Sequence, residues 1–111
     1  MRKVLGSEIV LYEEMVKYLP EYTDEEEVFA LFVTRDVISV RLTQGEKADP
    51  ELLALLARAD NTLVELWRWL SSTFPNIFDR DRKATIPPDY WWWHLDEGPD
   101  VREQAKASEA A

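Results

Sequence analysis

The stretch Thr23–Lys47, TDEEEVFALFVTRDVISVRLTQGEK, decides the fold because it can form either a helix or a β-hairpin. The case for a helix rests on its two ends. Thr23 and Glu26 have the spacing of a capping box ahead of an apolar run, and the acids at 24–27 lie where a helix dipole favours negative charge. Gly45 is placed to end such a helix. We therefore predict a helix over about residues 24–44.

The alternative is a β-hairpin over about residues 28–43. Folding the chain after Arg35 would place Val33 opposite Ile38, with further apolar pairs beyond them, so that one face of the ribbon would be apolar. The many β-branched residues in this range favour a strand. However, the turn has neither Gly nor Asn, which tight hairpins need, and a lone two-stranded ribbon is marginally stable. The helix is therefore favoured, and the hairpin stays open as the alternative.

The helical interpretation makes a prediction about the buried face of this segment. Five apolar residues share one side of the helix, and Asp36 intrudes among them. These five are Phe29, Phe32, Val33, Val37 and Val40. An acid on the core side needs a partner, so we expect Asp36 to pair with Arg58 or Arg68.

Two further stretches have the spacing of amphipathic helices. Apolar residues at steps of three and four predict a helix over about 7–19, which Pro20 ends. The same spacing predicts a helix over about 50–73, with Pro50 in its first turn and Pro75 beyond its end. With a helical middle segment, the chain is predicted to be all-α, a small three-helix bundle. The hairpin would make it α+β.

The remainder of the chain lacks the regular spacing of apolar residues that marks these helices. Residues 76–98 read as an irregular aromatic segment, which we expect to pack across the bundle. Residues 1–98 would then form a single helical domain. Residues 99–111 are polar and rich in Ala, so we expect a flexible tail.

Composition limits the possible functions. The chain has 111 residues with 22 acids and 13 bases, a net charge of −9, and this charge repels nucleic-acid phosphates. Direct nucleic-acid binding is therefore disfavoured. No stretch approaches the roughly 20 apolar residues that a membrane span needs. The absence of cysteine excludes thiolate chemistry and fits a reducing compartment, so we expect a cytoplasmic protein.

The aromatic stretch IPPDYWWWHLDEGP holds the most conspicuous candidate contact residues. Three adjacent tryptophans are too apolar to remain in water. Because adjacent residues point in different directions, we expect one or two of them to pack on the chain and at least one to face outward. The candidate partner-binding residues are Tyr90, Trp91, Trp92, Trp93 and His94, with Trp67 and Trp69 of the long helix.

Two smaller features of the sequence are a basic cluster and a single histidine. Arg80, Arg82 and Lys83 form a local basic cluster that could dock an acidic partner, or could pair with neighbouring acids. His94 is the only histidine, but no recognisable nucleophile motif accompanies it. Catalytic residues, a metal site and a cofactor are therefore not expected.

These observations favour a non-enzymatic protein–protein interaction module that self-associates. Its contact surface would combine the aromatic segment with the long helix, and its partner would be another protein or a second copy. One alternative is an acidic inhibitor or nucleic-acid mimic that binds a basic partner. The other is a small-ligand binder or enzyme centred on His94.

Overall fold

The computed structural model describes residues 5–110, and the chain divides into two compact units, Met1–Thr62 and Leu63–Ala111. The described residues form helices and connections, and no strand occurs among them. The all-α prediction is therefore confirmed, and the hairpin alternative is not supported. The elements are α1 (Leu5–Lys17), η1 (Leu19–Glu21), α2 (Glu25–Thr43), α3 (Pro50–Glu65), α4 (Trp67–Thr73), η2 (Pro75–Phe78), α5 (Arg80–Ala84), η3 (Trp91–Glu97) and α6 (Val101–Ala110).

The ends of α2 explain why the ambiguous stretch is helical. Asp24, rather than Thr23, is the N-cap, and its carboxylate accepts a 2.9 Å hydrogen bond from the backbone N–H of Glu26. At the other end, Gly45 has φ of 93°, a conformation that favours glycine and ends the helix. The expected capping box is therefore replaced by a simpler cap one residue later.

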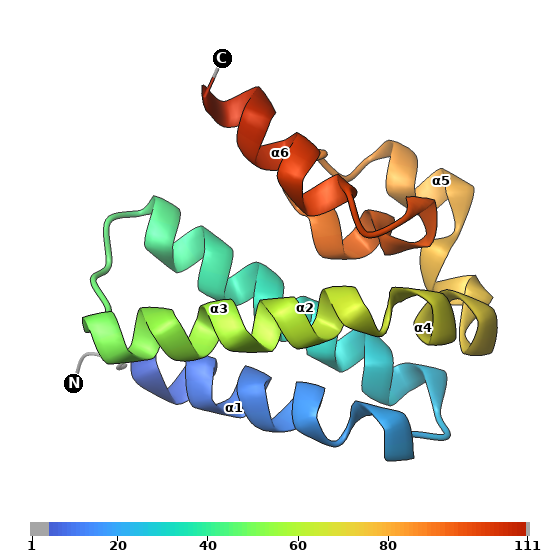
Figure 1. Cartoon of the computed structure of the whole chain (residues 1–111), viewed down its shortest axis with the longest axis horizontal. Helices are drawn as coiled ribbons and strands as arrows, with labels where there is room; N and C mark the ends of the chain where they lie inside the picture. The colour runs from blue at the N-terminus through green and yellow to red at the C-terminus, as the bar shows by residue number, and fades with distance from the viewer. Residues whose placement is uncertain (1–4, 111) are drawn as a thin grey trace. The chain divides into compact units, whose positions relative to one another are not determined.

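The first unit is built from α1, α2 and most of α3, which lie side by side (Figure 1). The predicted stripe of α1 is buried as expected. On α3, Leu56 and Ala59 turn inward. The inward residues of α1 and η1 are Leu5, Ile9, Tyr12, Val16 and Leu19. These side chains make the apolar core of this unit.

One polar network is buried in the first unit and joins its three helices. Asp60 of α3 accepts a 2.7 Å hydrogen bond from the Tyr12 hydroxyl of α1. Arg35 of α2 donates to both carboxylate oxygens of Asp60, at 3.0 and 3.1 Å. Burial alone would lower the pKa of Arg35, but the charge and hydrogen bonds of Asp60 and Tyr12 outweigh it and raise that pKa.

The buried face of α2 differs from the predicted one. The inward residues are Val28, Leu31, Phe32, Arg35 and Ile38. Asp36 is only half-buried, so the expectation that it faces the core was wrong. A buried Arg–Asp pair does exist, but it joins Arg35 to Asp60 instead. Only Phe32 of the predicted apolar face is buried, because α2 carries two apolar stripes and the other one packs inward.

The predicted long helix over 50–73 is interrupted. At Leu66 the backbone has φ −89° and ψ 6°, and the Leu66 N–H bonds to the Leu63 carbonyl at 3.1 Å. A bond to the third residue back tightens the turn, which separates α3 from α4. The change falls beside the boundary between the two units, after Thr62.

The second unit is organised around η3. This short helix contacts α4, η2 and α6, and its residues Trp91–Trp93 and Leu95 are buried. Residues 101–110, expected to be part of a flexible tail, form α6, with Val101 and Ala105 buried. Gly98, at φ 120°, makes the bend between η3 and α6.

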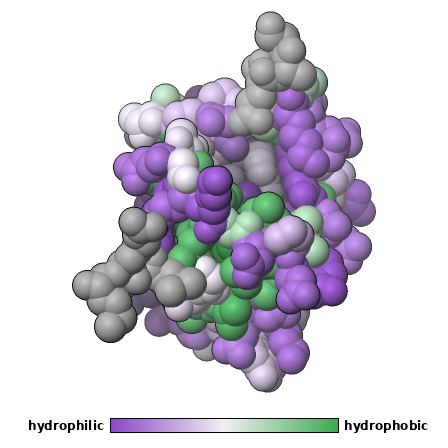
Figure 2. Space-filling view, turned by 90° about the vertical axis from the view of Figure 1, so that its left-hand side faces the viewer, coloured by the Kyte–Doolittle hydropathy of each residue, from purple (hydrophilic) through white to green (hydrophobic). Residues whose placement is uncertain are grey.

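Some apolar surface remains exposed. Figure 2 shows one face on which apolar side chains gather into a patch ringed by hydrophilic ones.

Within residues 5–110, no helix combines the length and the apolar character needed to cross a membrane.

Candidate functional site

The most regular exposed apolar surface of the first unit lies along α2. Four large side chains recur there at steps of four, four and three, which places them on one side of the helix. They are Phe29, Val33, Val37 and Val40, and they are 40%, 38%, 39% and 41% exposed. We call these four residues the α2 outer face. A stripe of this kind is the usual form of a surface that accepts another helix.

An acidic hollow marks the start of the α2 outer face. It has a volume of about 360 Å³ and is lined by Asp24, Glu25, Glu26 and Phe29. The acids also stabilise the helix start through the dipole and, for Asp24, through the cap. The hollow is therefore lined by three acidic residues and one aromatic residue.

On α2 itself, no accessible base accompanies this surface along most of its length. Between Asp24 and Val40 the sequence has a single basic residue, Arg35, which is buried against Asp60. Arg41 follows just beyond and is bound by Glu46 and, at 3.6 Å, by Glu8. The hydrogen bonds that Arg41 donates to Glu46 are the main reason that the pKa of Arg41 is raised. The α2 outer face is thus apolar with an acidic border.

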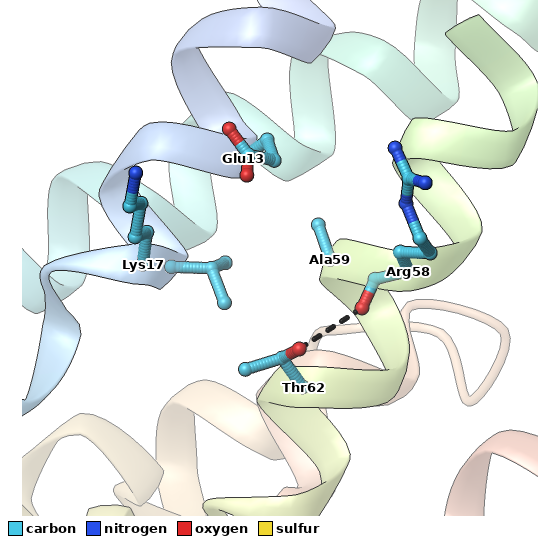
Figure 3. A pocket seen from close by; sticks show the side chains of 6 residues that line it. Glu13, Lys17, Arg58, Ala59 and Thr62 are labelled. Carbon is cyan, nitrogen blue, oxygen red and sulfur yellow. Dashed lines mark hydrogen bonds between the residues drawn. The ribbon is translucent and has the colours of Figure 1, made fainter. Parts of the chain in front are cut away.

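A second hollow of about 430 Å³ lies between α1 and α3 (Figure 3). Its floor is formed by the buried side chains of Val16 and Ala59. Its rim carries Glu13, Lys17 and Arg58, together with Thr62, whose hydroxyl donates to the Arg58 carbonyl. These are groups of both signs around an apolar floor, and none of the lining residues is a histidine or a cysteine. The hollow therefore offers an apolar floor with charged groups of both signs at its rim.

The sequence-predicted aromatic residues lie mostly inside the second unit. Trp91, Trp92 and Trp93 are only 5%, 1% and 3% exposed, so the expectation of an outward-facing tryptophan was wrong. The physical reason is that η3 is covered on several sides, by α4, η2 and α6, whereas we assumed a single covering surface. The half-buried Tyr90 stacks on Trp92 with ring centres 5.0 Å apart.

The two tryptophans of the predicted long helix are half-buried on α4. Trp69 packs edge-on against Phe74, with ring centres 5.8 Å apart. The guanidinium of Arg68 lies 5.2 Å from the ring centre of Trp67. These contacts hold both rings against the local chain.

His94 is placed as a structural residue. Its Nδ1 lies 3.2 Å from Glu97 Oε2, and its Nε2 lies 3.2 Å from the Ile86 carbonyl oxygen. Both ring nitrogens thus lie within 3.2 Å of an oxygen atom. This arrangement ties η3 to the preceding loop and gives no support to catalysis.

Two residues of the basic cluster, Arg82 and Lys83, make contacts within the chain. Arg82 donates to the Ile77 carbonyl at 3.0 Å, and Lys83 bonds to Asp96 and Glu97 at 2.9 and 3.1 Å. Burial would lower the pKa of Lys83, but these carboxylates outweigh it and raise that pKa. Arg80 is exposed. The structure thus shows pairing of Lys83 with acids, although not with the neighbouring acids that the sequence suggested.

Neither a metal site nor a known relative indicates a chemistry for this chain within its described residues. Across the described part of the chain, no group of three or more His, Cys, Asp or Glu side chains could hold a metal ion. No protein-family model, no curated protein and no solved structure matches this chain. A function must therefore be inferred from the surface itself.

Sequence reasoning identified the α2 outer face residues but assigned them to the core. It missed the inward role of Arg35 and its pairing with Asp60 and Tyr12. One signal was present: α2 has apolar residues on two sides, and a bundle of three helices has room to bury only one of them.

Proposed function

We propose that this chain is a protein–protein interaction module whose contact surface is the α2 outer face. The observation that carries the proposal is the exposure of four large apolar side chains on successive turns of one helix. Single exposed apolar residues are ordinary, but an aligned set on one helix is a feature of helix-docking surfaces. The docked segment would be an amphipathic helix of another protein.

The strength of such docking can be bounded from the exposure values. Fully burying a Val or Phe side chain contributes about 1.5–3 kcal/mol. With about two-fifths of each side chain still exposed, covering all four would contribute on the order of 2.5–5 kcal/mol. A dissociation constant of 1 mM corresponds to about 4 kcal/mol, and association has its own entropic cost. Apolar contact alone therefore supports transient binding, and tighter binding needs polar contacts as well.

Self-association, expected from the sequence, becomes the main alternative for the occupant of this face. The aromatic segment no longer supports it, because the three indoles are buried in a single chain. We also infer a cytoplasmic location, since a chain without cysteine suits a reducing compartment.

Site-specific photo-cross-linking in native lysate tests the proposal. A benzoylphenylalanine would replace Val33 on the α2 outer face, and a matched control would carry it at Val10 of α1, which is 44% exposed. A discrete heterologous adduct formed from position 33 and not from position 10 is the expected result. Equal labelling from both positions, or none from position 33, would overturn the proposal. An adduct of two copies would support the surface and identify self-association.

A further inference from the structure

We propose that the α2 outer face receives a basic amphipathic helix, whose apolar stripe covers the four side chains and whose Lys or Arg residues reach the acidic hollow. This inference rests on the proposed function and adds the chemistry of the partner. It is carried by charge complementarity, because the apolar stripe and the acids occur together on one helix.

The arrangement of acids indicates where the partner's charges would lie. Glu25 and Glu26 line the hollow next to Phe29, at the N-terminal end of the stripe. Asp36 comes three residues after Val33 and four before Val40, so it borders the same side of α2. From Phe29 to Val40 the stripe is about 16 Å long at 1.5 Å per residue. A partner helix of about three turns spans it, with its bases concentrated at the end that meets the hollow.

A second copy of the chain is a poorer occupant for the same reason. Residues 1–62 hold 13 of the 22 acids and 7 of the 13 bases, so this part has a net charge of −6. Two α2 outer faces brought together would place acidic borders near each other, with Arg35 buried and Arg41 already bound by Glu46. Like charges across an interface oppose association.

Fluorescence anisotropy with synthetic helical peptides tests the inference. The basic probe carries leucines at spacings of four, three and four, with lysines on its flanks, and the matched probe replaces each lysine by glutamate. The full-length chain is expected to bind the basic probe at least about tenfold more tightly than the acidic one. Binding should weaken as sodium chloride rises from roughly 50 to 300 mM, because exposed charges are screened.

Two protein variants separate the effect of the acidic hollow on peptide binding from the effect of the overall charge. Glu25→Gln with Glu26→Gln should weaken binding of the basic probe about 2-fold to 30-fold, the range for two exposed charge pairs. Glu14→Gln with Glu21→Gln removes the same charge from exposed positions of α1 and η1 and should change binding by less than about twofold.

The outcomes distinguish this inference from the proposed function. If both probes bind equally and Val33→Asp with Val37→Asp abolishes both, the docking surface stands and the basic partner is excluded. If the two glutamine pairs weaken binding equally, the acidic hollow has no specific role and the inference fails. If neither probe binds while light scattering shows a dimer that Val37→Asp disrupts, the occupant is a second copy. If neither probe binds and position 33 gives no adduct, both proposals fail.

Discussion

Replacing Asp60 by alanine should destabilise the first unit more than any other single polar substitution in it. The Asp60 carboxylate accepts hydrogen bonds from Tyr12 at 2.7 Å and from Arg35 at 3.0 and 3.1 Å. Its removal leaves the guanidinium of Arg35, whose side chain is 10% exposed, without this ion pair in the interior. It also removes the acceptor of the fully buried Tyr12 hydroxyl.

The expected loss follows from the one-sided removal of a buried charge. Such changes cost about 3–5 kcal/mol, which is a large share of the roughly 5–15 kcal/mol that stabilises a small domain. Tyr12→Phe removes only one hydrogen bond to a charged group and should cost about 1.5–3 kcal/mol. Replacing both charges, as in Arg35→Met with Asp60→Leu, should cost only about 1–3 kcal/mol, because no uncompensated charge remains and only the Tyr12 hydroxyl loses this acceptor.

The assay is urea unfolding followed by far-ultraviolet circular dichroism. Tryptophan emission alone is unsuitable, because all five tryptophans lie beyond residue 63 and report on the second unit. Asp60→Asn preserves the volume of the side chain, so a comparable loss in that variant assigns the effect to charge rather than to a cavity. A loss below about 1 kcal/mol for Asp60→Ala, or a double variant as unstable as the single one, would refute the reasoning.

Three further predictions concern the second unit, Leu63–Ala111. Trp92→Ala should destabilise it by about 3–5 kcal/mol, seen as a lower urea midpoint in tryptophan emission, because Trp92 is 1% exposed. Gly98→Ala should cost about 1–3 kcal/mol in the same assay, since φ is 120° there. Burial would raise the pKa of Glu97, but Lys83 outweighs it and lowers that pKa below the ordinary 4.5. The Lys83–Glu97 pair therefore stabilises the folded unit above pH 4.5, and this contribution is lost as the pH falls through the lowered pKa of Glu97. Lys83→Met should thus make acid unfolding less steep. The change should be small because the Glu97 side chain is 52% exposed.

The helical fold could be predicted because its signals are local. Pro50 begins α3, Gly45 ends α2, and both act through their own backbone conformation. The break at Leu66 could not be predicted in the same way, because Leu has no intrinsic preference for ending a helix. The change in backbone there falls close to the boundary between the two units, after Thr62.

The interior partners were harder to predict than the helices. Periodicity predicted one apolar face for α2, but the helix carries apolar residues on a second side, and that side meets α1 and α3. Arg35 could be recognised as an inward residue only once Asp60 was known to face it from 25 positions away in the sequence. An ion pair of this kind is a tertiary contact, and neither residue carries a local signal for it.

The aromatic triplet and the α2 outer face show why strong hydrophobicity is a poor guide to contact surfaces. Burying three tryptophans contributes on the order of 11–19 kcal/mol as an upper limit, so folding within one chain already favours covering them. The α2 outer face exposes four smaller side chains, each by about two-fifths. The free energy gained by burying them is much smaller, so a free chain can leave them exposed to water. A reversible docking surface requires such moderate exposure. Under the proposed function, the residues that would meet a partner are therefore the valines of α2, whereas the three indoles are buried in the core of the second unit.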